Sequence, residues 1–218
     1  MNLVYRICWF IGYLLLHLLF GFRVKGAHLV PRRGAVILAS NHISLIDPVA
    51  VAVATPREVT FIARSEPFKL PVLSWLLPRL GVIPVERGHS DLGAIKAAIQ
   101  ALQQGVAFGI FPEGTRSRNA KLQPFKTGAA AIALRTGATI VPVAVYGSDK
   151  AWGVGRKGPT LFKPITVVFG EPLPVATGKT GHQALEELTK GLEAAIASLL
   201  PPEYRGDSLA HEQAGRQA

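Results

Sequence analysis

A chain of 218 residues, 49% of them hydrophobic and 17% charged, is long enough for one compact domain with an attached segment and too apolar for extensive disorder. The formal net charge of +10 predicts attraction to an anionic partner, either nucleic acid or an anionic lipid surface. Cys8 is the only cysteine, which excludes an intramolecular disulfide and a cysteine-based zinc site.

The first segment, LVYRICWFIGYLLLHLLFGF at residues 3–22, is almost wholly apolar and is followed by Arg23 and Lys25. A spanning helix needs about 20 predominantly apolar residues, and this stretch only just reaches that length while carrying Arg6. We therefore expect residues 1–25 to form a membrane-associated helix that is embedded or anchoring. A cleaved signal peptide is the alternative, but no small-x-small cleavage site follows the apolar run.

From Gly34 onward, short runs rich in Val and Ile alternate with longer stretches at helical spacing, a pattern typical of an α/β layered domain. We expect residues 26–200 to form this domain, with a mixed, mostly parallel sheet flanked by helices. Residues 201–218 are polar and uncapped, and they predict a flexible tail. The expected strands occupy residues 35–40, 59–64, 81–87, 106–111, 139–147 and 165–170.

Helices are expected between these strands and after the last one. Residues 90–105 form an amphipathic pattern that starts at Ser90 as N-cap and stops at Gly105. Residues 70–80 are apolar nearly all round, so they must face the core, an acyl chain or a membrane on every side. We expect most of their side chains to face the core. Residues 182–200 close the domain as a further helix.

The stretch NHISLIDP at residues 41–48 places His42 ahead of Asp47 by five positions. On one continuous helix, positions five apart lie about 500° round the axis, so these two side chains can meet only across a turn. The expected strand ends at Ser40, and Asp47 before Pro48 fits an N-cap with proline at the first helical position. In that geometry Asp47 accepts the proton of one imidazole nitrogen and leaves the other as a base. The pattern alone is equally consistent with a capping aspartate and a polar loop histidine.

A second stretch, FPEGTRSR at residues 111–118, follows an apolar run with an acid, a glycine and two arginines. Arg116 offers a planar fork of donors to phosphate, Thr115 offers a hydroxyl, and Gly114 lets backbone N–H groups approach closely. Glu113 can accept a hydrogen bond from a substrate hydroxyl or hold an arginine in place. The loop predicts anion binding, and the alternative is a β-turn with solvated charges.

Arg87 ends the expected strand GVIPVER, at the kind of position where open α/β sheets bind their ligands. Taken in order, NHxxxxD, GVIPVER, FPEGTRS and IVPVAV (residues 140–145) resemble the four blocks of the glycerolipid acyltransferase family, over about residues 26–174. The branch that the blocks resemble most is the 1-acyl-glycerol-3-phosphate acyltransferases. Each block is weak singly, but four in order at domain-scale spacing make a strong signal.

The resemblance implies that His42 is the general base and Asp47 its orienting partner. It implies that the acceptor's phosphate is bound by Arg87 and by the loop residues Glu113, Gly114, Thr115 and Arg116. An oxyanion in the transition state needs backbone N–H donors, for which residues near Gly114 or near Asn41 are candidates.

The implied reaction moves an acyl group from an acyl thioester, either acyl-CoA or acyl carrier protein, to the free hydroxyl of lysophosphatidate, forming phosphatidate. No covalent enzyme intermediate is needed. The implied place of work is the cytoplasmic face of the cell membrane, with the chain peripheral or anchored by its N-terminal helix. Acylation of another lyso-lipid, such as a lyso-amino-acid lipid, is an alternative within this class. A non-catalytic membrane lipid-binding module is an alternative outside it.

Other chemistries find less support in the residues. GVGRKG at 153–158 formally matches GxGxxG, but Pro159 follows where a helix should begin, so we interpret it as a basic loop and expect no cofactor. The six histidines are dispersed without ligand spacing, and we expect no metal site. No nucleic-acid-binding motif accompanies the positive charge, so an anionic membrane surface is the expected partner and nucleic acid is not.

Overall fold

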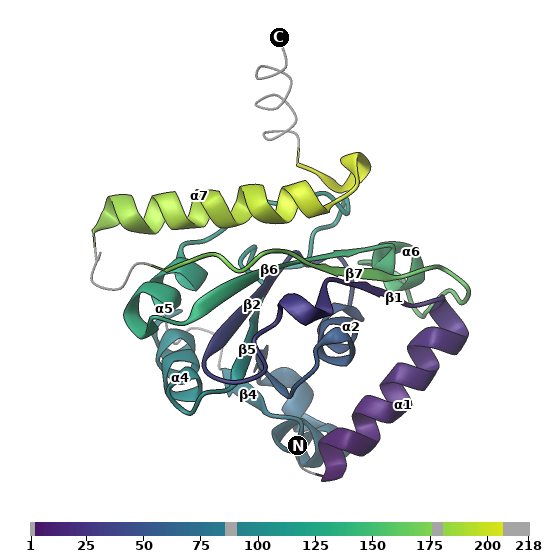
Figure 1. Ribbon diagram of the computed structural model, residues 1–218. Helices are drawn as coiled ribbons and strands as arrows, with labels where there is room; N and C mark the ends of the chain where they lie inside the picture. The colour runs from purple at the N-terminus through teal and green to yellow at the C-terminus, as the bar shows by residue number, and fades with distance from the viewer. Residues whose placement is uncertain (1–2, 86–90, 176–180, 207–218) are drawn as a thin grey trace.

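The computed structural model describes residues 3–85, 91–175 and 181–206. Within these ranges, seven strands form one sheet in the order β1-β7-β6-β2-β5-β3-β4 (Figure 1). Neighbouring strands pair in parallel, except that β6 and β7 are antiparallel. The predicted mixed, mostly parallel sheet is therefore confirmed. The strands are β1 (Arg23–Lys25), β2 (Val36–Ser40), β3 (Val59–Arg64), β4 (Val82–Val85), β5 (Ala107–Ile110), β6 (Thr139–Tyr146) and β7 (Thr166–Phe169).

Helices cover both faces of this sheet. One face packs against α1 (Leu3–Phe20) and α2 (Asp47–Ala54), and the other against α4 (Asp91–Gln103), α5 (Gly128–Thr136) and α7 (His182–Leu199) (Figure 1). Because both faces are covered, the central strands are continuous apolar runs, as in β2, where every residue is buried. The shorter helices are α3 (Pro71–Arg79), α6 (Ser148–Trp152), η1 (Ala27–Leu29), η2 (Glu66–Lys69) and η3 (Pro202–Tyr204).

The predicted strands and helices are confirmed with small shifts at their ends. The predicted strand 81–87 corresponds to β4, but its residues after 85 lie outside the described part of the chain. The predicted helix 90–105 corresponds to α4, and its expected cap, Ser90, also lies outside. Elements that the pattern did not predict include β1, which is short and polar, α5, which is rich in alanine, and the short helix α6.

The prediction that α3 faces the core is wrong. None of its residues is buried, and Val72 and Trp75 are among the most exposed large apolar side chains of the chain. Among the described elements, the helix makes its main contacts with η2 and β4, and β4 is the last strand at one edge of the sheet. An apolar helix beside an edge strand has too few neighbours to cover it on all sides.

The N-terminal helix α1 packs along α2 through one stripe and leaves its other face open (Figure 1). Tyr5, Leu16 and Phe20 are buried, and the Trp9 indole Nε1 donates a hydrogen bond to the carbonyl of Val53. By length and composition α1 could cross a membrane, a test that a core helix can also pass. Its exposed apolar side chains are Leu3, Ile7, Phe10, Ile11, Tyr13, Leu14, Leu15 and Leu18.

The chain after α7 packs against the domain as far as it is described. Tyr204 is buried, accepts a hydrogen bond from the Gly147 amide at 3.2 Å and donates one to Asp149 Oδ1 at 2.9 Å. This part of the predicted tail is held because an aromatic ring fills space beside β6 and its hydroxyl finds two partners. Residues 207–218 of the predicted tail lie outside the described part of the chain.

Candidate active site

The turn between β2 and α2 brings His42 and Asp47 together. His42 Nδ1 lies 2.8 Å from Asp47 Oδ2, and the Asp47 side chain is fully buried. Since a carboxylate can only accept hydrogen bonds, Nδ1 carries the proton and Nε2 has its lone pair available. The arrangement is that of a base held in one tautomer by an acid.

Asp47 is fixed by more than the histidine. Its Oδ2 also accepts the backbone N–H groups of Ile43 and Ser44, both at 2.7 Å, and its Oδ1 accepts the Ser148 hydroxyl at 2.6 Å. The helix begins at Asp47 with Ile46 at the N-cap, so the predicted capping role of Asp47 is wrong. The carboxylate does not cap the turn that follows because it is occupied by donors from the turn that precedes it.

Two polar side chains tie the turn to the end of β6 and to α6. The Asn41 amide pairs with the backbone of Val145 in both directions, donating to its carbonyl at 2.8 Å and accepting from its N–H at 2.7 Å. The Ser44 hydroxyl donates to the carbonyl of Trp152 at 2.6 Å. The side chain of Asn41 is therefore fully engaged in holding the turn against β6.

One face of the His42 ring is held by an aromatic stack. The Phe111 ring lies 4.1 Å from the imidazole centroid and nearly parallel to it, and Phe61 stacks on Phe111 at 6.0 Å. Gly109 makes room for this arrangement, because a Cβ there would lie 2.1 Å from the Phe61 ring. A larger residue at this position in β5 would displace the stack and with it the imidazole.

Glu113 is buried behind the turn, with both carboxyl oxygens turned toward the protein. Oε1 accepts the His42 backbone N–H at 2.7 Å, and Oε2 accepts that of Gln123 at 3.3 Å. Burial raises the pKa of this carboxyl from 4.5 to about 8, against the opposing effect of the two backbone hydrogen bonds. In this geometry Glu113 positions the His42 turn, and both of its carboxyl oxygens are engaged by backbone N–H groups.

The rest of the predicted phosphate loop lies beside Glu113 at the surface. Gly114 has a left-handed φ of 72°, which favours glycine, and its N–H donates to the Phe111 carbonyl at 3.0 Å. Thr115 and Arg116 are exposed. The ammonium of Lys126 lies over the same turn, 3.1 Å from where a Cβ on Gly114 would be. Arg87, the remaining predicted site residue, lies outside the described part of the chain.

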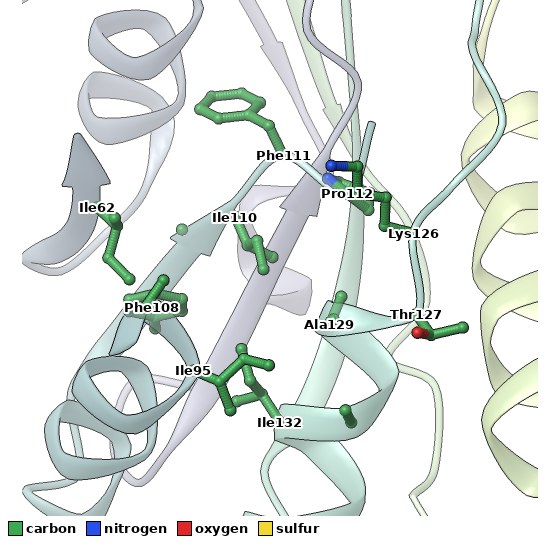
Figure 2. A pocket seen from close by; sticks show the side chains of 14 residues that line it. Ile62, Ile95, Phe108, Ile110, Phe111, Pro112, Lys126, Thr127, Ala129 and Ile132 are labelled. Carbon is green, nitrogen blue, oxygen red and sulfur yellow. The ribbon is translucent and has the colours of Figure 1, made fainter. Parts of the chain in front are cut away.

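An apolar cavity of about 340 Å³ opens between β5 and the helices α4 and α5. Figure 2 shows Ile95 and Ile132 at one end of it and Phe111, Pro112 and Lys126 at the other, with the Phe111 ring turned away from the isoleucines. The cavity therefore ends at the residue that stacks on His42. In the described ranges, no group of three or more His, Cys, Asp or Glu side chains is placed to hold a metal ion.

A family model described as Acyltransferase matches residues 21–146, which include β2, the His42 turn, the loop at 111–118 and β6. The chain belongs to the acyltransferase family. Its 1-acyl-sn-glycerol-3-phosphate acyltransferase relative from Bacillus subtilis is 27% identical over 199 residues, covering 90% of this chain and 96% of that protein. The relative of the same name from Borreliella burgdorferi is 34% identical over 128 residues, covering 58% of this chain and 51% of that protein.

A chloroplastic 1-acyl-sn-glycerol-3-phosphate acyltransferase of Brassica napus is 31% identical over 139 residues, covering 63% of this chain and 40% of that protein. The chain thus spans about half the length of several curated relatives that it matches. Among solved structures, the 1-acyl-sn-glycerophosphate acyltransferase PlsC from Thermotoga maritima superimposes with a TM-score of 0.73 at 28% identity, covering 88% of this chain and 76% of that one.

The acyltransferase fold brings most of the predicted residues together at the carboxyl ends of the central strands. His42, Asp47 and Glu113 form one hydrogen-bonded unit, and Gly114, Thr115 and Arg116 continue from it. Two residues of this region escaped prediction, namely Ser148 and Lys126. Ser148 follows β6 directly, and a hydroxyl after a predicted strand was a signal for it. Lys126 approaches the loop only through the fold, and the sequence alone gave no signal for it.

Proposed function

We propose that the chain catalyses transfer of an acyl group from an acyl thioester to the free hydroxyl of lysophosphatidate, forming phosphatidate. The observation that carries this proposal is His42 Nδ1 held at 2.8 Å by a fully buried Asp47, inside the part of the chain that matches the family. The relatives named as 1-acyl-sn-glycerol-3-phosphate acyltransferases supply the acceptor.

In the proposed reaction, His42 Nε2 accepts the acceptor's hydroxyl proton as that oxygen attacks the thioester carbonyl. The tetrahedral intermediate collapses, the carbon–sulfur bond breaks, and the imidazolium returns the proton to the departing thiolate. Asp47 stays ionised and stabilises the imidazolium between the two steps. A positioned base of this kind contributes a factor of about 10² to 10⁴ in rate. No residue of the chain becomes acylated.

The acceptor's phosphate is assigned to the surface of the 111–118 loop. Arg116 and Lys126 are cations beside Gly114, and Thr115 adds a hydroxyl. Arg87 belongs to the proposed site through the family resemblance. Glu113 is not assigned to the phosphate, because its buried oxygens accept backbone N–H groups.

The apolar parts of the substrates need apolar surroundings. The cavity between β5, α4 and α5 has the lining that a fatty acyl chain requires, and it ends beside His42. The exposed apolar side chains of α1 and α3 suit contact with a bilayer. We assign the protein to the cytoplasmic face of the cell membrane, held there by α1 and by its positive charge.

One assay tests this function against its alternatives. Purified protein is incubated with labelled acyl-CoA or acyl carrier protein and with a panel of acceptors: lysophosphatidate, other lysophospholipids and a lyso-amino-acid lipid. We expect labelled phosphatidate as the main product. A preference for another acceptor would replace lysophosphatidate in the proposal. Lipid binding with no product from any pair would favour the non-catalytic lipid-binding module.

A further inference from the structure

A second cavity, of about 270 Å³, lies beyond the carboxyl ends of the central strands and shares no lining residue with the apolar cavity. One wall is formed by Ser117, Arg118 and Asn119, which continue the proposed phosphate loop. The other wall contains Asp149 and Arg156, from α6 and from the GVGRKG loop that resembled a nucleotide motif. We call this space the polar cavity.

Both walls of the polar cavity are bonded to the turn that carries His42. The Ser117 N–H donates to the His42 carbonyl at 2.7 Å. On the other side, Ser44 and Gly153 form a β-bridge, and the Ser44 hydroxyl donates to the neighbouring Trp152 carbonyl. A group bound in this cavity is therefore held in a defined position relative to the imidazole.

The side chains of the polar cavity favour an anion. Arg118 and Arg156 are both exposed, so their guanidinium groups can reach a ligand. Arg156 donates one hydrogen bond, to the Thr160 hydroxyl at 2.8 Å, and keeps its other donors. Asp149 is the one acid of the lining, and its carboxylate accepts the Tyr204 hydroxyl. Two cations against one engaged acid leave a positive site.

The proposed reaction has two phosphate-bearing substrates, and only the acceptor's phosphate has been placed. The acyl donor carries a phosphate at the end of its phosphopantetheine arm, in acyl-CoA and in acyl carrier protein alike. This end of the donor is water-soluble, as the polar lining requires. We propose that the polar cavity binds the phosphopantetheine phosphate of the acyl donor through Arg118 and Arg156. This inference rests on the proposed acyltransfer.

The test compares donors that differ only in this phosphate. Steady-state rates are measured for Arg118→Ala, Arg156→Ala and the double variant, with acyl-CoA and with the matched pair acyl-phosphopantetheine and phosphate-free S-acyl-pantetheine. Charge-assisted hydrogen bonds of this kind correspond to about a 10- to 100-fold change in affinity. We expect each single variant to raise the KM for the two phosphate-bearing donors by about that factor, and to leave the KM for the phosphate-free thioester unchanged.

Acyl carrier protein is assayed beside acyl-CoA to identify the source of the phosphate. If KM rises for both acyl-CoA and acylated acyl carrier protein, the arginines bind the phosphopantetheine phosphate that the two donors share. If KM rises for acyl-CoA and not for acyl-phosphopantetheine, the arginines bind the nucleotide, and the proposal is overturned. Lys157→Ala is the matched control, because this neighbouring exposed cation does not line the cavity. If Lys157→Ala raises the KM for these donors equally, the effect comes from the overall loss of positive charge and not from a phosphate site in the polar cavity.

Arg116→Ala supplies the opposite selectivity, since it should raise the KM for lysophosphatidate and not that for the donor. The inference fails if the variants at Arg118 and Arg156 instead raise the KM for lysophosphatidate. Calorimetric binding of coenzyme A, without turnover, separates this failure from failure of the proposed function. If the wild-type protein forms no acylated product while both variants bind coenzyme A about 10- to 100-fold more weakly than it does, the result supports the phosphate site and contradicts the proposed reaction.

Discussion

At the scale of single residues, the site depends on one buried carboxylate that serves four donors. The sequence predicted the His42–Asp47 pair because the two residues flank a turn, but it could not predict the extra donors. Ile43 and Ser44 contribute backbone groups, which no residue type reveals, and Ser148 is the first residue of α6, far away in the sequence. The same holds for Glu113, whose inward orientation depends on the position of the His42 amide.

The first prediction separates the base from its support. His42→Ala should lower turnover by at least about 10²-fold, and it should leave lysophosphatidate binding and the melting temperature nearly unchanged because the ring is partly exposed. Asp47→Asn should lower turnover and stability together, since an amide leaves at least one of the four donors unpaired, at about 1–3 kcal/mol.

These two variants are compared by single-turnover kinetics and thermal melts. His182→Ala is the control, because this histidine is exposed on α7 and lies outside the site. Activity of His42→Ala within a few-fold of wild type would remove His42 as the base. Wild-type stability of Asp47→Asn would show that the carboxylate network does not hold the turn.

The second prediction follows from the pKa of Glu113, which burial raises from 4.5 to about 8. Between these values the folded state binds more protons than the unfolded state, so this group lowers the free energy of unfolding as pH rises, by up to about 1.4 kcal/mol per pH unit. Glu113→Gln removes the titration. We expect the variant to match the wild type near pH 5 and to become the more stable protein toward pH 8.

Denaturant unfolding at several pH values measures this difference. Glu187→Gln, at an exposed position on α7, controls for the loss of a carboxyl group elsewhere. Parallel curves for the Glu113→Gln variant and the wild type over this range would show that Glu113 is ionised when buried. The shifted pKa would then be contradicted.

At the scale of elements, patterning predicted the buried strands well because β2 and β6 are apolar on both faces. Patterning failed for elements whose burial or pairing is determined by tertiary contacts. The residues of α3 are apolar, but the helix lies against the edge strand β4 and stays uncovered. Polar β1 forms a strand only because β7 offers it hydrogen-bonding partners. Alanine-rich α5 has no strong period of its own and is positioned by packing against α4 and α7.

The third prediction concerns the apolar cavity beside α5. Gly128 lines the cavity, and a Cβ added there meets no atom within 4 Å, so Gly128→Phe adds bulk without displacing backbone. If an acyl chain occupies this space, kcat/KM for a long-chain donor should fall by roughly tenfold or more, and that for a short-chain donor should change little. Competition between labelled donors of two lengths measures the ratio.

Gly191→Phe is the control for this experiment. Gly191 has equal room for a side chain, but it lies on α7 and does not line the cavity. A loss that is the same for long and short donors in Gly128→Phe would place the acyl chain elsewhere. The apolar cavity would then have no part in donor selection.

At the scale of the whole molecule, the proposed membrane contact has an apolar component and a charged component, which differ in their physics. Apolar burial survives high salt, whereas attraction of basic residues to anionic lipid is screened within a Debye length of about 8 Å at physiological ionic strength. Leu161 and Phe162 extend the apolar surface, and the Phe162 N–H donates to the Leu19 carbonyl at the end of α1. The apolar contribution thus comes from α1 and from the chain beside it.

The fourth prediction tests this division with the fold intact. Removing α1 would delete Tyr5, Leu16 and Phe20, which belong to the core, and would uncover the side chains that they pack against, so point substitutions are preferable. Phe10→Glu, Leu14→Glu and Leu18→Glu together change one exposed face of the helix. We expect the wild type to stay on anionic vesicles at high salt. The triple variant should bind at low salt and dissociate as salt rises.

Co-sedimentation across a salt series measures both proteins. Gln183→Glu, Ala194→Glu and Ser198→Glu on α7 add the same number of negative charges at exposed positions away from α1. Release of the wild-type protein by moderate salt would make α1 a core helix of a soluble domain. Equal salt sensitivity of the two triple variants would assign the effect to charge and not to the apolar face.

The antiparallel pairing of β6 with β7 has a consequence for how this protein can diversify. Because Tyr146 pairs with Thr166, the chain leaves β6 and enters β7 at the strand ends that lie near His42. A parallel crossover would have taken the chain to the opposite ends of the strands. Residues 147–165 therefore form an excursion that begins and ends on the same side of the sheet, and it includes Ser148, Arg156 and Phe162. Changes in the length or sequence of that excursion can alter the proposed donor and membrane contacts without altering the order of the strands.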